Sequence, residues 1–105
     1  MVFVETSVFT DAVLEALTDE EYRALQTSLM VRPSQGAVMP STGGLRKMRW
    51  GAAGRGKRGG VRAIYYWDEA HDRVYLLLIY RKAAQDDLTP AQLKVVKRLV
   101  REEFK

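Results

Sequence analysis

The segment that most constrains the fold is residues 73–82, RVYLLLIYRK, because the apolar run at its centre is unbroken. Such a run is typical of a strand buried on both faces, whereas alternation marks a strand with one solvated face. Residues 61–67, VRAIYYW, are rich in the β-branched and aromatic types that favour strands. The polar residues 68–72, DEAHD, predict a turn between them. The two segments therefore predict a hairpin whose second strand must be covered on both sides.

Two further strands are predicted nearer the N-terminus. Residues 45–50, LRKMRW, alternate, which places Leu45, Lys47 and Arg49 on one face of a strand. Residues 2–6, VFVET, are short, apolar and β-branched. Residues 34–44 are rich in Gly, Ser and Pro and are predicted to be a loop. The strands at 45–50, 61–67 and 73–82 are expected to form an antiparallel meander.

Two helices are predicted between the first strand and this loop. Thr10 has the position of an N-cap for a short helix that runs to residue 17. Thr18 and Glu21 have the spacing of a capping box, which starts a second helix. Pro33 ends that second helix.

The last helix has the clearest start signal in the sequence. Thr89 is its N-cap, Pro90 takes the first helical position, and Gln92 completes a capping box. Its apolar stripe is formed by Leu93, Val96, Leu99 and Val100. The element order β-α-α-β-β-β-α predicts an α+β fold, with helices packed on an antiparallel sheet in a single domain over residues 1–105.

Composition excludes several classes of protein. The chain contains no cysteine, which excludes disulfides and thiolate zinc sites. No apolar run approaches the about 18–20 residues that span a bilayer. The N-terminus, MVFVETSVF, lacks the basic region of a signal peptide. The expectation is a soluble cytoplasmic protein.

Charge is distributed unevenly along the chain. The formal net charge is +4, yet residues 1–40 contain six acidic and two basic residues, so residues 41–105 carry +8. Such asymmetry indicates a polyanionic partner for the second part of the chain. A soluble protein with no role in nucleic-acid binding remains the alternative at this point.

The stretch Gly51–Gly60, GAAGRGKRGG, resembles a phosphate-binding loop. It begins with the spacing G-x-x-x-x-G-K, but Arg58 stands where a P-loop needs Ser or Thr to bind magnesium. A P-loop also leads from a strand into a helix, and here strands flank the stretch on both sides. A nucleotide site is therefore rejected.

Other catalytic chemistries have little support in the sequence. His71, the single histidine, lies with Asp68, Glu69 and Asp72 in a predicted turn, where a solvated turn is favoured over a metal site. Asp86 and Asp87 are interpreted as loop charge rather than as an acid–base pair, and no serine lies in a nucleophile-elbow pattern.

Basic residues remain as the candidates for function. Seven of them fall between residues 46 and 62 with no acidic residue among them: Arg46, Lys47, Arg49, Arg55, Lys57, Arg58 and Arg62. In a meander, Lys47, Arg49, Arg62 and either Arg81 or Lys82 gather in one region of the sheet. Cations held together on rigid strands repel one another unless an anion is bound, and a phosphodiester supplies one. The alternative is a solvated basic edge that prevents aggregation.

The segments PSTGGLRKMRW, GGVRAIYYW, VYLLLIYRK and DLTPAQLKVVKRLV together resemble the RelE/HigB type of toxin from bacterial toxin–antitoxin pairs, in its HigB-like branch. The resemblance covers nearly the whole chain and implies a small α+β fold of the microbial-RNase type. It implies a metal-independent mRNA interferase that acts in the ribosomal A site, with no cofactor. In such enzymes the RNA 2′-hydroxyl attacks the adjacent phosphorus and leaves a 2′,3′-cyclic phosphate.

By position, the basic residues of this family match Lys47 and Arg49, Arg62, and Lys82, with Arg81 as the close alternative. The hypothesis assigns Lys47 as general base, Arg62 as the phosphate clamp, Arg49 as a stabilising charge and Lys82 as the group that assists the leaving oxygen. The sequence departs from relatives that carry a C-terminal tyrosine, because residues 83–90 contain no aromatic residue. Tyr66 and Tyr80 are more readily interpreted as sheet or core aromatics.

The resemblance also implies partners. A cognate antitoxin with a helix-turn-helix region would neutralise the toxin, and the complex would bind operator DNA. The glycine-rich stretch is interpreted as an arm that docks on RNA or the ribosome through Arg55, Lys57 and Arg58, with Arg46 and Arg81 as further RNA contacts. A non-catalytic RNA- or ribosome-binding module built on the same basic sheet is the alternative.

Overall fold

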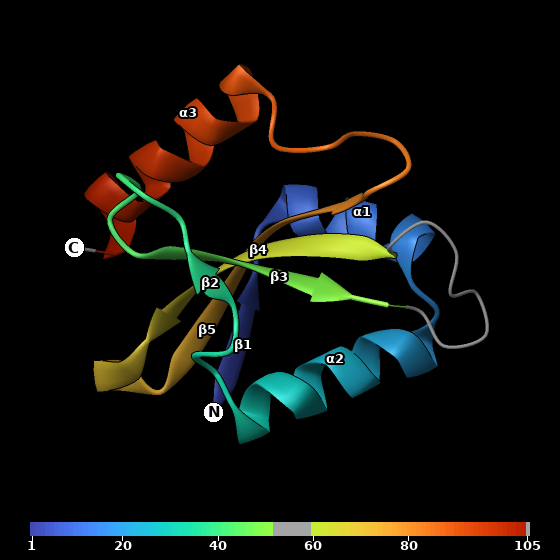
Figure 1. The fold of residues 1–105 in the computed structure, drawn as a ribbon. Coiled ribbons are helices and arrows are strands. Elements are labelled where there is room, and N and C mark those ends of the chain that lie inside the picture. Colours follow the sequence, from blue (N-terminus) through green and yellow to red (C-terminus); the bar gives the residue numbers. More distant parts are fainter. Residues whose placement is uncertain (52–59, 105) are drawn as a thin grey trace.

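In a computed structural model, residues 1–51 and 60–104 of the protein are described. Within them a five-stranded sheet has the order β1-β5-β4-β3-β2 and is packed by helices (Figure 1). The elements are β1 (Val2–Glu5), α1 (Ser7–Ala16), α2 (Asp19–Val31), β2 (Ala37–Val38), β3 (Leu45–Trp50), β4 (Val61–Asp68), β5 (Arg73–Arg81) and α3 (Pro90–Leu99). A short 3-10 turn spans Glu69–His71, and a π-helical turn, Val100–Phe104, follows α3.

The α+β class and the meander are confirmed. β3, β4 and β5 pair antiparallel in sequence order. The sheet is nevertheless mixed, because β1 runs parallel to β5. It also gains a strand inside the predicted loop, where β2 pairs antiparallel with β3. The observed order is therefore β-α-α-β-β-β-β-α.

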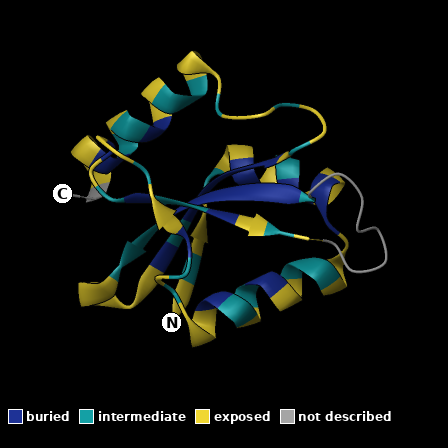
Figure 2. Cartoon of the chain, in the orientation of Figure 1, coloured by how far each residue is buried: buried dark blue, intermediate teal, exposed yellow. Residues whose placement is uncertain are grey.

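β5 is covered on both faces, as its apolar run predicts. Val74, Leu76 and Ile79 pack with α1 and α2 in one core cluster, and Leu77, Leu78 and Tyr80 pack with α3 in the other. A bulge opposite Ile64 and Tyr65 leaves Leu77 outside the regular pairing, which accounts for two successive leucines on the α3 side. β4 is buried along most of its length (Figure 2).

The helix starts agree with prediction in two cases of three. The capping boxes at Thr18 with Glu21 and at Thr89 with Gln92 are both present. The prediction of Thr10 as a cap is wrong: α1 begins directly after β1, with Thr6 as N-cap accepting from the Phe9 N–H at 3.0 Å. Thr10 lies inside α1 and its hydroxyl donates to the Glu5 carboxylate at 2.6 Å. Among the described helices, none is long and apolar enough to cross a bilayer.

Candidate functional site

A basic cleft of about 560 Å³ lies on the face of the sheet that also carries α3. It is lined by Gln35, Ala37, Lys47, Met48, Arg49, Arg62, Lys82 and Asp86. The four predicted catalytic residues, Lys47, Arg49, Arg62 and Lys82, therefore line one cavity, which we call the cationic cleft. They come from β3, from β4 and from the residue that follows β5, so the meander brings them together.

Arg49 and Arg62 are direct cross-strand neighbours. Like charges placed opposite each other destabilise a strand pair unless they are compensated. Arg62 is also buried, with 7% of its surface exposed, and its Nη1 donates to the Val61 carbonyl at 3.4 Å. The two arginines, one buried and one exposed, lie opposite each other on neighbouring strands and form a site suited to an oxyanion.

Lys82, rather than Arg81, reaches the cationic cleft. The Arg81 guanidinium donates to the Glu15 carbonyl at the end of α1, on the other side of the sheet. The backbone N–H of Lys82 donates to the Gly60 carbonyl at 3.0 Å, which fixes Lys82 beside the start of β4. The alternative that the sequence left open is resolved in favour of Lys82 as the cleft residue.

The other predicted RNA contacts lie apart from the cleft or outside the described residues. Arg46 lies on the opposite face of β3, where its Nη1 donates to the carbonyls of Ser34 at 2.9 Å and Gly36 at 2.8 Å. It thereby ties the loop before β2 to the sheet, and its contact with RNA stays a prediction, as does that of Arg81. Three predicted docking residues are outside the described residues: Arg55, Lys57 and Arg58.

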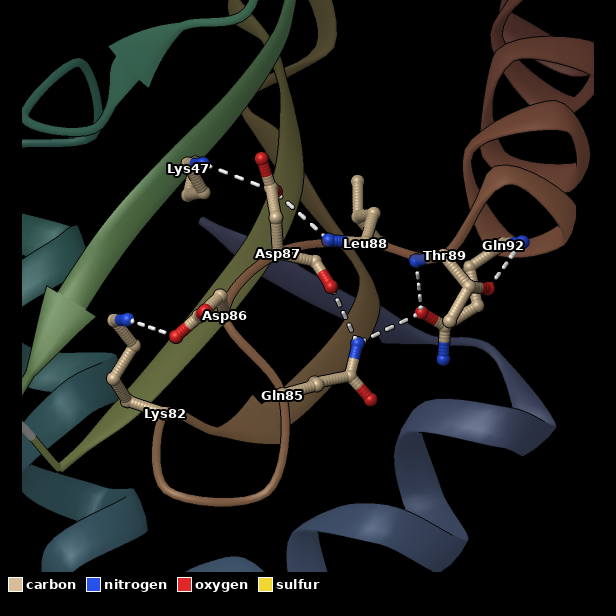
Figure 3. Close-up of polar contacts among 8 residues, drawn as sticks. All are labelled: Lys47, Lys82, Gln85, Asp86, Asp87, Leu88, Thr89 and Gln92. Atoms are coloured by element: carbon tan, nitrogen blue, oxygen red, sulfur yellow. Dashed lines mark hydrogen bonds and ion pairs between the residues drawn. The ribbon is translucent and has the colours of Figure 1, made fainter.

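Two carboxylates from the segment after β5 contact the cleft lysines (Figure 3). Lys47 Nζ lies 3.2 Å from Asp87 Oδ1, and Lys82 Nζ lies 2.7 Å from Asp86 Oδ1. The hydrogen bond from Lys82 lowers the pKa of Asp86. The hydrogen bond from the Leu88 N–H is the main cause of the lowered pKa of Asp87, and the hydrogen bond from Lys47 is the next. Sequence reasoning assigned both acids to a loop, and because residues 82–88 form no helix, no periodic pattern indicated these contacts.

Tyr80 lies in the core cluster on the α3 side of the sheet, next to a cleft residue. It is the cross-strand neighbour of Arg62 and is only 6% exposed. Burial raises the pKa of Tyr80, the charge of Asp87 raises it further, and Arg62 acts in the opposite direction. Its hydroxyl has no hydrogen-bond partner within 3.5 Å among residues 1–51 and 60–104, although a weaker polar contact with Asp87 also raises its pKa. Tyr66 instead packs its ring against Tyr75, with centroids 6.4 Å apart.

The turn around His71 is exposed. His71 Nδ1 lies 3.0 Å from Asp68 Oδ2, and both belong to the turn between β4 and β5. No group of three or more histidine or acidic side chains in the described part of the chain is arranged to hold a metal ion. This turn therefore adds nothing to the cationic cleft.

No family model matches the chain. Among solved structures, the protein is similar to the E. coli toxin RelE, determined as a double mutant in the free state, with a TM-score of 0.52. The alignment covers 81% of this chain and 86% of that chain at 14% sequence identity. At this identity the similarity concerns the backbone arrangement. The protein has a RelE-like fold.

Proposed function

We propose that this protein is a toxin of the RelE type, in its HigB-like branch, that cleaves mRNA on the ribosome without a metal cofactor. The observation that carries the proposal is the convergence of Lys47, Arg49, Arg62 and Lys82 on one cleft of a RelE-like fold. Fixed cations stabilise the negative charge that gathers on the equatorial oxygens of a pentavalent phosphorus. Such a site catalyses transphosphorylation by stabilising this charge and by holding the phosphate in position.

In the proposed reaction, Lys47 in its neutral form removes the proton of the RNA 2′-hydroxyl. The 2′-oxygen forms a bond to phosphorus while the bond from phosphorus to the 5′-oxygen breaks. Lys82 in its protonated form donates a proton to the leaving 5′-oxygen. Arg62 and Arg49 bind the nonbridging oxygens. The products are a 2′,3′-cyclic phosphate and a 5′-hydroxyl.

The second candidate, a non-catalytic RNA-binding module, predicts aromatic side chains on the surface for stacking on bases. The aromatic residues of β3 and β4 instead pack within or against the two core clusters. Tyr65 is fully buried, and Trp50 and Trp67 pack against the same cluster. The Trp50 indole also donates to the Glu21 carbonyl at 3.2 Å. This placement favours the nuclease.

The proposal implies partners and a place of action. The substrate is mRNA in the ribosomal A site, and cleavage inhibits translation in the cytoplasm. A cognate antitoxin with a helix-turn-helix region is expected to neutralise the protein and to bring it to operator DNA. Each of these follows from the proposed toxin function.

The test is to induce the protein in a bacterial cell and to map the new 5′ ends of mRNA. We expect cuts phased with codons, each leaving a 5′-hydroxyl and an upstream 2′,3′-cyclic phosphate. Lys47→Ala should abolish the cuts while the variant remains folded by circular dichroism. Growth inhibition and ribosome binding without cuts would support the binding module instead.

A further inference from the structure

The segment between β5 and α3 carries two carboxylates into the region of the cationic cleft. Asp86 itself lines the cleft, and Asp87 contacts Lys47 (Figure 3). Both lysines proposed to act in proton transfer, Lys47 and Lys82, are thus bound by acids from residues 85–87, which we call the acidic segment. In the proposed RNA complex, the oxygens of the scissile phosphodiester approach the same two lysines.

The acidic segment is held in place by mostly exposed contacts. Gln85 Nε2 donates to the Asp87 carbonyl and to Gln92 Oε1, both at 2.9 Å. Gln92 Oε1 also accepts from the Thr89 N–H, so the segment is anchored to the start of α3. The side chains of Asp86 and Asp87 are 93% and 64% exposed. Ion pairs this exposed are weak and exchange readily.

A carboxylate on Lys47 opposes both the proton transfer assigned to this lysine and the approach of the scissile phosphate. The carboxylate accepts a charge-assisted hydrogen bond from the ammonium, and an ammonium has no lone pair to accept the 2′-hydroxyl proton. It also places a negative charge where a phosphate must approach. Asp87 and a bound phosphate therefore exclude each other on Lys47.

We propose that Asp87 is a displaceable internal anion, which occupies on Lys47 the position of an RNA phosphate oxygen and so weakens RNA binding to the free protein. The inference rests on the proposed function for the identity of the ligand, an RNA phosphate. On binding, Asp87 moves off Lys47, and the scissile phosphate takes its place beside this lysine. The segment thus lowers the affinity of the cleft for anions, RNA included.

The test is the affinity of Asp87→Asn for a 2′-O-methylated single-stranded RNA oligonucleotide, which cannot be cleaved, measured by fluorescence anisotropy at low salt. Asparagine keeps an amide oxygen that can accept from the Leu88 N–H, as Asp87 Oδ1 does at 2.8 Å. We expect binding about two- to fivefold tighter than wild type, the effect of removing one exposed ion pair. Asp11→Asn, an exposed change of equal charge on α1, controls for net charge and should give a smaller gain.

The same two substitutions in a Lys47→Met background show whether the effect depends on Lys47. In a Lys47→Met background, Asp87→Asn should tighten binding no more than Asp11→Asn does. If Asp87→Asn in the wild-type background gains no more than Asp11→Asn, or if binding weakens, the inference is overturned.

The outcome is separable from that of the proposed function. Tighter binding by Asp87→Asn without any mRNA cleavage by the wild type would support the internal anion and reject the nuclease. Cleavage by the wild type without tighter binding by Asp87→Asn would support the nuclease and reject the internal anion.

Discussion

Two buried tyrosines on neighbouring strands differ in what their hydroxyls contact. Tyr65 Oη donates to the Pro33 carbonyl at 2.7 Å and accepts from the Gly36 N–H at 2.8 Å. Tyr65→Phe leaves both backbone groups without this partner, and we expect a loss of about 1–3 kcal/mol in the free energy of unfolding, measured in urea.

Tyr80→Phe is the matched control, because the Tyr80 hydroxyl has no hydrogen-bond partner among the described residues. Its effect should stay within about 0.5 kcal/mol. Equal losses in the two variants would contradict the view that Tyr65 ties the loop before β2 to the sheet.

The titration of Tyr80 reports the charge of Asp87. Burial and Asp87 raise the pKa of Tyr80 above 10.0, so the folded protein retains the phenol proton at a pH where the unfolded chain loses it. Stability therefore falls as pH rises above 10.0 toward the folded-state pKa. Asp87→Asn should lower the pKa of Tyr80, followed by NMR of the tyrosine ring carbons. An unchanged or higher pKa would mean that Asp87 does not act on Tyr80.

At the scale of elements, the junction of β3 and β4 depends on one glycine. Gly60 has a φ of +59°, and a Cβ there would lie 2.4 Å from the Trp50 carbonyl oxygen. Gly60→Ala should destabilise the protein by about 1–3 kcal/mol, measured by thermal unfolding.

Gly51→Ala is the control for Gly60→Ala, because no atom of the described residues lies within 4 Å of a Cβ placed at Gly51. It should leave the melting temperature nearly unchanged. A Gly60→Ala variant as stable as Gly51→Ala would refute the close approach at this junction.

The elements with strong local signals were predictable from the sequence. The capping boxes at Thr18 and Thr89 start helices, because the hydrogen bonds of a capping box form between residues three apart in the sequence. The α1 start at Thr6 was missed because Thr10 offers the same side chain, and β1, which fixes the boundary, is held by pairing with β5. β2 has only two residues, Ala37 and Val38, too few for alternation to show.

Part of the candidate site was also predictable, because it follows from local sequence patterns. Strand alternation places Lys47 and Arg49 on one face, and the meander brings Arg62 beside them. The choice between Arg81 and Lys82 depends on where β5 ends, which periodicity does not fix. Asp87 reaches Lys47 from a loop 40 residues away in sequence. Such a contact depends on the path of the loop, which no local pattern encodes.

For the molecule as a whole, charge separation predicts how binding depends on salt. Residues 41–105 carry +8 against −4 in residues 1–40. Replacing Arg55, Lys57 and Arg58 with alanine should weaken ribosome binding and reduce the slope of log affinity against log salt by about 2. Unchanged binding in a sedimentation assay over a range of salt concentrations would show that the stretch Gly51–Gly60 only connects two strands and does not bind the ribosome.

The central claim is that the cationic cleft cleaves ribosome-bound mRNA. Its most direct test is the single-turnover cleavage rate on programmed ribosomes for wild type, Lys47→Ala and Lys94→Ala, the last being an equal charge change on an exposed position of α3. We predict a rate at least about 100-fold lower for Lys47→Ala and a rate near that of wild type for Lys94→Ala. Equal rates for Lys47→Ala and Lys94→Ala would contradict the claim.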